Sequence, residues 1–133
     1  MHSKPRIITF PNNGSLEIGY LAFGENFQAI PFEIKRVFWA YYTPDSILRG
    51  RHAHYATEMI LIAAAGRIVV TTELRRQRPK VFILEKPNQG LYLPELCWHT
   101  MQYSHNSVQL VIASTTYNES DYIRDYEQFK SIR

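Results

Sequence analysis

The chain has 133 residues, of which 45% are hydrophobic and 20% charged, and its net charge is +3 at pH 7. This length suits one domain with a core of its own, so residues 1–133 are predicted to form a single domain. The only cysteine, Cys97, excludes an internal disulfide, and the longest apolar run, 59–65, is far too short to span a membrane. We therefore expect a cytoplasmic protein that binds neither nucleic acid nor membrane.

The first third of the chain consists of short apolar and β-branched runs separated by turn residues. Residues 6–10 predict a strand, and "PNNG" at 11–14 predicts a turn. Residues 15–23 alternate apolar and polar side chains, which is typical of a strand. A connection at 24–32 then leads to 33–43, whose β-branched and aromatic residues predict a central strand.

Further strands are expected after the middle of the chain, at 58–66, 66–74, 80–86, 89–96, 98–104 and 107–117. Altogether, roughly nine short strands at close spacing indicate a β-sandwich or barrel. The basic segment "RRQRPK" at 75–80 falls between two of these runs. We interpret it as a solvated hairpin loop, because no aromatic-interleaved basic stripe accompanies it.

The C-terminal segment 118–130 differs from the rest and predicts one helix on the outside of the barrel. Asn118 and Ser120 are suitable N-caps for it. Its apolar residues recur at helical spacing: Tyr122, Ile123, Tyr126 and Phe129.

The segment "RGRHAHYATEM" at 49–59 carries the candidate chemistry. Alternation along a strand directs His52 and His54 to the same face, and Glu58 joins them if the strand runs unbroken. With His99 added, these residues form a ligand set that suits iron, manganese, nickel or zinc. One hypothesis is therefore a metal-dependent enzyme that uses His52, His54, Glu58 and His99.

A second hypothesis is acid–base catalysis without a metal. An imidazole titrates near ~6.5, so within a pocket it can remove and return a proton near neutral pH. Two neighbouring histidines can serve two adjacent carbons of a sugar, as the movement of a carbonyl through an enediol requires. Arg49, close before them, can hold a phosphate or stabilise a developing oxyanion.

The whole sequence resembles one family, the WxcM-like sugar 3,4-ketoisomerases, through "PFEIKRVFWAYY", "RGRHAH", "MILIAAAGRIVV", "GLYLPELCWHTM" and "VIASTTYNESDYIRDYEQF". The resemblance implies a cupin jelly-roll barrel, all-β with a short C-terminal helix, that forms a homodimer and needs no metal or other cofactor. It also implies conversion of dTDP-4-keto-6-deoxy-D-glucose to a dTDP-3-keto-6-deoxyhexose, on the way to 3-amino sugars of cell-surface glycans such as lipopolysaccharide. The family's catalytic histidines fall on His52 and His54.

The resemblance also indicates substrate-binding residues. The arginine of the family's "RG" pair falls on Arg49, and Arg36, Asn13 and His99 are expected around the pyrophosphate and hexose. Positions 13 and 99 differ between family members that make galacto and gluco products. His99 favours the galacto product, whereas Asn13 matches neither type.

Some pocket positions depart from the family. Phe38 and Met59 stand where the family often has tyrosine and glutamine. Tyr41 or Tyr42 can replace the lost hydroxyl, but alternation allows only one to face inward, and we choose Tyr41. These departures leave a third hypothesis open, a non-catalytic sugar-nucleotide binding protein.

Overall fold

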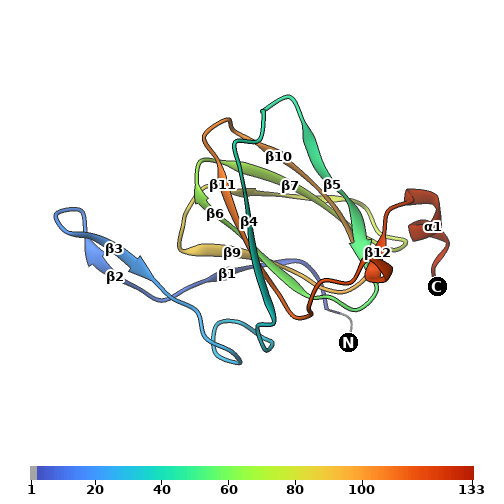
Figure 1. The fold of residues 1–133 in the computed structure, drawn as a ribbon, viewed down its shortest axis with the longest axis horizontal. Helices are drawn as coiled ribbons and strands as arrows, with labels where there is room; N and C mark the ends of the chain where they lie inside the picture. The colour runs from blue at the N-terminus through green and yellow to red at the C-terminus, as the bar shows by residue number, and fades with distance from the viewer. Residues whose placement is uncertain (1–2) are drawn as a thin grey trace.

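The computed structural model, which describes residues 3–133, consists of two facing antiparallel sheets and a separate hairpin (Figure 1). The first sheet contains, in spatial order, β1 (Arg6–Thr9), β9 (Gln89–Leu93), β6 (Met59–Ala65), β11 (Val108–Ala113) and β4 (Arg36–Tyr41). The second contains β12 (Tyr122–Ile123), β5 (Leu48–His54), β10 (Cys97–Tyr103), β7 (Ile68–Leu74) and β8 (Lys80–Leu84). The predicted all-β jelly-roll architecture is confirmed.

The main core lies between the two sheets and explains the continuous apolar run in β6. Met59, Leu61 and Ala63 point inward to meet residues of β7, β10 and β11. Ile60 and Ile62 point outward, yet they are also buried, because the segment before β4 covers that face of the sheet. A strand that is buried on both faces has no polar alternation, so a helix could not be excluded from composition alone.

The hairpin near the N-terminus differs from the prediction. Residues 12–15 form a strand, β2 (Asn12–Ser15), where a turn was expected, and the chain reverses at 16–18 before β3 (Gly19–Ala22). The hairpin projects away from the two sheets (Figure 1). Its apolar residues do not enter the core: Leu16 is 93% exposed and Ile18 is 84% exposed.

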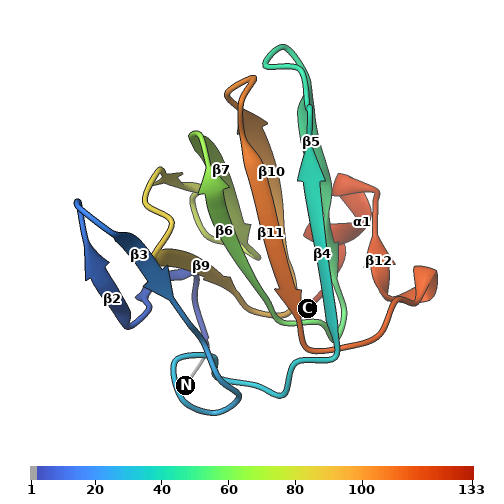
Figure 2. The ribbon, with the colours of Figure 1, turned by 60° about the vertical axis from the view of Figure 1, so that its left-hand side comes forward.

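The strand within 33–43 was predicted to be central, but β4 is an edge strand of the first sheet. It pairs only with β11, and its other edge is open (Figure 2). Its side chains are largely exposed, including Trp39 at 61%. The β-branched and aromatic composition of β4 therefore reflects a surface that no part of the described chain covers.

The predicted C-terminal helix is correct in kind but starts later than expected. A 3₁₀ turn, η1 (Glu119–Asp121), and the short strand β12 precede α1 (Tyr126–Ser131), whose N-cap is Asp125. Pairing of β12 with β5 uses the backbone groups that a longer helix would need. Phe129 of α1 is fully buried against the outer face of β5. Within residues 3–133, no helix has the length and apolarity to cross a membrane.

Candidate active site

A β-bulge in β5 sets the direction of the site residues. His99 of β10 lies opposite His52, but the next residue, Thr100, lies opposite Gly50, so Arg51 is the extra residue of the bulge. Gly50 and Arg51 both have positive φ, 86° and 59°. Because of the bulge, Arg49 reaches the same cavity as His52, although simple alternation would direct the two side chains to opposite faces.

Three histidines meet in the space between the sheets. The ring centroids of His52 and His54 are 5.0 Å apart, and those of His52 and His99 are 4.7 Å apart. His54 and His99 are almost completely buried, whereas His52 is half-buried. The predicted convergence of His52, His54 and His99 is therefore present.

Each of these imidazoles is held through its Nδ1 atom. The Nδ1 of His52 lies 3.0 Å from the carbonyl oxygen of Gly50, and that of His99 lies 3.1 Å from the carbonyl oxygen of Cys97. A carbonyl can only accept, so Nδ1 must donate in both rings. In the neutral ring the Nε2 atom then carries the free lone pair, which is the form that a general base needs.

Burial keeps these histidines neutral. It is the main cause that lowers the pKa of His52 below its usual range, that of His54 to about 4, and that of His99 to about 3. A neighbouring histidine lowers the pKa of His54 and of His99 further. Near pH 7 the cluster therefore offers neutral bases.

Asp121 orients His54. Its Oδ2 atom lies 3.2 Å from the His54 Nδ1 and accepts a hydrogen bond from the Thr57 hydroxyl. Its Oδ1 atom accepts a 2.7 Å hydrogen bond from the backbone N–H of Ala56. The carboxylate is thus fixed from three sides, and it holds the proton of His54 on Nδ1.

Tyr122 and Arg124 were not predicted as site residues. The centroid of the Tyr122 ring lies 4.3 Å from that of His54 and 5.0 Å from that of His52. The Arg124 guanidinium lies over the Tyr122 ring, 4.3 Å from its centroid. Both line the cavity. The segment "DYIR" at 121–124, which is part of the family resemblance, was the signal available in the sequence. We instead interpreted the helical spacing of the apolar residues in 118–130, Tyr122 among them, as the face of a helix that packs on the barrel.

The cavity around the cluster has a volume of about 420 Å³, which is within the usual range for small-ligand sites. Its wall consists of residues from both sheets and from the β12 segment: Phe38, Trp39, Ala40, Tyr41, Arg49, Gly50, His52, Met59, Leu61, His99, Met101, Tyr103, Gln109, Val111, Tyr122 and Arg124. The predicted residues Tyr41, Arg49, His52 and His99 are therefore brought together, and His54 lies directly behind His52 and Tyr122. Tyr42 is 87% exposed and is absent from the lining.

Two other predicted binding residues lie outside the lining. Arg36 is partly buried between the rings of Phe38 and Tyr117, and its charge helps to lower the pKa of His54. Its Nε atom is buried and forms no hydrogen bond within residues 3–133. Asn13 lies in the projecting β2 strand and is exposed.

The prediction that Glu58 joins His52, His54 and His99 as a metal ligand is wrong. The chain leaves the strand after His54, so alternation does not continue to residue 58. Glu58 instead accepts a 2.5 Å hydrogen bond from the Tyr92 hydroxyl and lines a different cavity. No cluster of three or more His, Cys, Asp or Glu side chains in the described part of the chain is arranged to hold a metal ion.

Known proteins share this sequence and architecture. The family model described as "WxcM-like, C-terminal" (FdtA) matches residues 3–133. A TDP-4-oxo-6-deoxy-alpha-D-glucose-3,4-oxoisomerase of Aneurinibacillus thermoaerophilus is 37% identical over 113 residues, which are 84% of this chain and 81% of that protein. This chain belongs to the WxcM-like sugar 3,4-ketoisomerase family.

Solved structures of the family superpose closely on the chain. A 3,4-ketoisomerase from Helicobacter canadensis gives a TM-score of 0.91 at 37% identity, over 97% of this chain and 96% of that chain. The sugar 3,4-ketoisomerase QdtA from Thermoanaerobacterium thermosaccharolyticum, solved in complex with TDP, gives 0.91 at 32% identity, over 98% and 94%. The resemblance stated from the sequence is confirmed, and with it the jelly-roll fold and the isomerase class.

Proposed function

We propose that the chain converts dTDP-4-keto-6-deoxy-D-glucose to a dTDP-3-keto-6-deoxyhexose, with His52 and His54 as the catalytic residues. The observation that carries this proposal is the pair of neutral imidazoles whose Nδ1 atoms are both engaged and whose Nε2 atoms remain free. The proposed substrate is supported by the names of the relatives above, a TDP-4-oxo-6-deoxy-alpha-D-glucose-3,4-oxoisomerase and a sugar 3,4-ketoisomerase.

The reaction needs one proton to move from C3 to C4 and another from the C3 oxygen to the C4 oxygen. In our proposal a histidine of the pair takes the C3 proton, the C–H electrons form a C3–C4 double bond, and the carbonyl electrons move onto the C4 oxygen. The C3 hydroxyl proton of this enediolate then moves to the C4 oxygen. The C3 oxygen forms the new carbonyl, and the electrons of the double bond take the proton back from the protonated histidine at C4. The chain needs no cofactor for these steps.

The arginines around the histidines provide the complementary charge for a sugar nucleotide. Arg49 and Arg124 line the cavity, and the buried Nε of Arg36 has a free donor that a substrate oxygen would satisfy. Tyr41 also lines the cavity, and we propose that it contacts the substrate. We assign the diphosphate to these arginines and the hexose to the space beside the histidines.

For the product we propose the galacto configuration at C4. This proposal rests on His99, which lines the cavity and lies opposite His52. Proton NMR tests both proposals: a new 3-keto sugar nucleotide should form, and a small coupling between H4 and H5 would identify the galacto product. A large coupling would identify the gluco product, and binding without any conversion would favour a sugar-nucleotide binding protein instead.

We further propose that the protein acts as a homodimer in the cytoplasm. The projecting hairpin and the open edge of β4 expose Leu16, Ile18 and Trp39, and apolar edges of this kind are normally covered. A second copy is the natural cover, and the hairpin of one subunit could then deliver Asn13 to the cavity of its partner. The lone buried thiol of Cys97, with no disulfide, suits a reducing compartment.

Sedimentation analysis tests the dimer. The wild-type protein should sediment as a dimer, and the variant Leu16→Glu/Ile18→Glu should sediment as a folded monomer. The matched variant Val81→Glu, which alters an exposed apolar residue of β8 away from the hairpin, should remain dimeric. A monomeric wild-type protein would contradict the proposal and the assignment of Asn13 together.

A further inference from the structure

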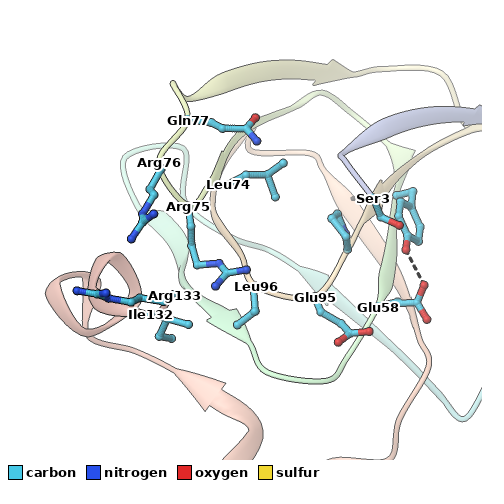
Figure 3. Close-up of a pocket in the computed structure, with 12 residues that line it drawn as sticks. Ser3, Glu58, Leu74, Arg75, Arg76, Gln77, Glu95, Leu96, Ile132 and Arg133 are labelled. Carbon is cyan, nitrogen blue, oxygen red and sulfur yellow. Dashed lines mark hydrogen bonds between the residues drawn. The ribbon is translucent and has the colours of Figure 1, made fainter. Parts of the chain in front are cut away.

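A second cavity, of about 540 Å³, lies apart from the histidine cluster. It is bordered by the β7–β8 loop, the segment after β9 and the C-terminal residues, as Figure 3 shows. None of the residues that line the catalytic cavity lines this one. Its wall includes two arginines of the basic segment 75–80, which the proposed reaction does not use.

Three arginines line one side of this cavity. Arg75 and Arg76 belong to the β7–β8 loop, and Arg133 follows α1 (Figure 3). No ion pair between described residues includes any of the three, although Arg67, Arg124 and Lys130 all have acidic partners. Like charges that line one side of a cavity without a counter-charge repel one another, and a bound anion reduces that repulsion.

The backbone on both sides of the cavity is held in an unusual conformation. Arg76 has φ 61° and Leu96, on the facing segment, has φ 56°. Residues other than Gly, Asn and Asp rarely occupy this region, because their Cβ atom then lies too close to the backbone. Both residues line the cavity.

Carboxylates lie at the opposite end of the same cavity. Glu58, which is held by the Tyr92 hydroxyl, and Glu95 are separated from the arginines in Figure 3. They repel an anion from their own end and so confine negative charge to the arginine side. The separation of charge along the cavity gives a bound molecule one orientation.

We propose that this cavity binds a small anion of the phosphate class, seated on Arg75, Arg76 and Arg133. Guanidinium groups suit phosphate because their N–H groups can contact two oxygens at once. The anion could be free phosphate or pyrophosphate, or the diphosphate of a nucleotide. This binding site is independent of the proposed isomerase reaction, and binding alone tests it.

The test is an NMR titration of the uniformly ¹⁵N-labelled protein with inorganic pyrophosphate at constant ionic strength. The backbone amides of Gln77 and Ile132 report on this cavity, and those of Gly50 and Met101 report on the catalytic cavity. Leu96 is unsuitable as a reporter, because its N–H donates to the carbonyl oxygen of His54 and so senses both sites. Gln77 and Ile132 should show saturable shifts.

The double variant Arg75→Gln/Arg76→Gln should raise the Kd for pyrophosphate at least about tenfold, because it removes two charged hydrogen-bond donors. Arg78→Gln is the matched control: it removes a charge from the same loop, but residue 78 does not line the cavity. Shifts confined to Gly50 and Met101, equal loss in both variants, or unchanged affinity in the double variant would each overturn the proposal.

A parallel titration with TDP identifies the source of the anion. Tighter binding of TDP than of pyrophosphate at Gln77 and Ile132 would assign the site to a nucleotide diphosphate, and the reverse order would assign it to the free anion. A circular dichroism spectrum equal to that of the wild type confirms that each variant is folded. If neither pyrophosphate nor TDP caused saturable shifts of these two amides, the assignment of the cavity to phosphates would be overturned.

Discussion

The Nδ1 atom of His54 and the Oδ2 atom of Asp121 are 3.2 Å apart, although 67 residues of sequence separate them. The contact depends on β12, which pairs Tyr122 with His54 and thereby places the preceding aspartate beside the imidazole. Asp121 receives two further hydrogen bonds, from Ala56 and Thr57, so its position does not depend on His54. The aspartate therefore fixes which nitrogen of His54 carries the proton.

Replacing Asp121 by Asn should lower kcat by about tenfold or more, with little change in the affinity for TDP. The asparagine oxygen can still accept the Ala56 N–H, which turns the amide NH₂ toward His54. The imidazole would then have to accept at Nδ1 and carry its proton on Nε2, so the free lone pair would be lost. Steady-state kinetics and calorimetric TDP binding measure the two quantities.

Asp125→Asn is the control for this substitution, because it makes the same chemical change four residues away, at the N-cap of α1. Asparagine is as good an N-cap as aspartate, so stability and activity should both be retained. An Asp121→Asn enzyme with wild-type kcat would show that the carboxylate does not set the state of His54.

Substitution of either catalytic histidine should nearly abolish turnover. His52→Asn and His54→Asn are each expected to lower kcat by about 10²–10⁴, the usual contribution of general acid–base catalysis. His105→Asn should leave kcat unchanged, since His105 is exposed on the loop between β10 and β11. If either active-site variant turned over substrate as fast as the wild type, that histidine could not be a proton carrier.

Acidification should reduce stability through the buried histidines. Unfolded histidine takes up a proton near pH 6.5, whereas folded His54 and His99 do so only near pH 4 and pH 3. Between these values the unfolded state binds more protons, so the stability is complete above about pH 6.5 and is lost as the pH falls toward 4 and 3.

Urea denaturation at about pH 7 and about pH 5 measures this loss directly. In His99→Gln, whose side chain does not titrate, the difference between the two pH values should be smaller than in the wild type. A free energy of unfolding that is equal at both pH values, or greater at about pH 5, would contradict the neutral, buried state of the cluster.

Gly50→Ala should damage both the fold and the site. A Cβ atom at this position would lie 2.8 Å from the His99 carbonyl oxygen and 3.0 Å from the Met101 side chain. We expect a loss of about 2–4 kcal/mol in the free energy of unfolding, from backbone strain together with the clash, and a lower kcat.

Gly19→Ala separates the two causes, because Gly19 has nearly the same φ, 87°, but has no atoms near its Cβ position. It should lose only the strain contribution, about 1 kcal/mol. Equal losses for the two variants in urea denaturation would mean that close packing against β10 does not constrain Gly50.

The sequence was sufficient to predict most of the strands and the inward pair of histidines, because these depend on local alternation. Arg49 was expected in the site because of its closeness to the histidines in sequence and the family resemblance, not because of alternation. The continuity of a strand was not predictable: the chain turns after His54, and that turn removes Glu58 from the cluster. The bulge at Gly50 and Arg51 was likewise not predicted, although it is what brings Arg49 to the cavity.

Residues of the C-terminal segment were misassigned for a related reason. The spacing of Tyr122, Ile123, Tyr126 and Phe129 fits a helix, but long-range pairing with β5 makes the first two a strand. Tertiary pairing overrides a local periodic pattern when a free strand edge is available. The exposed apolar hairpin has a similar explanation, because an alternating pattern does not reveal whether the apolar face is covered by the same chain.

The most direct test of the proposed mechanism is proton NMR of dTDP-4-keto-6-deoxy-D-glucose with this protein in deuterated buffer that contains EDTA. We expect a 3-keto product with deuterium at C4, and neither product nor exchange with the His52→Asn variant. An unchanged substrate spectrum with the wild-type protein, or product formed only after a metal ion is added back, would contradict it.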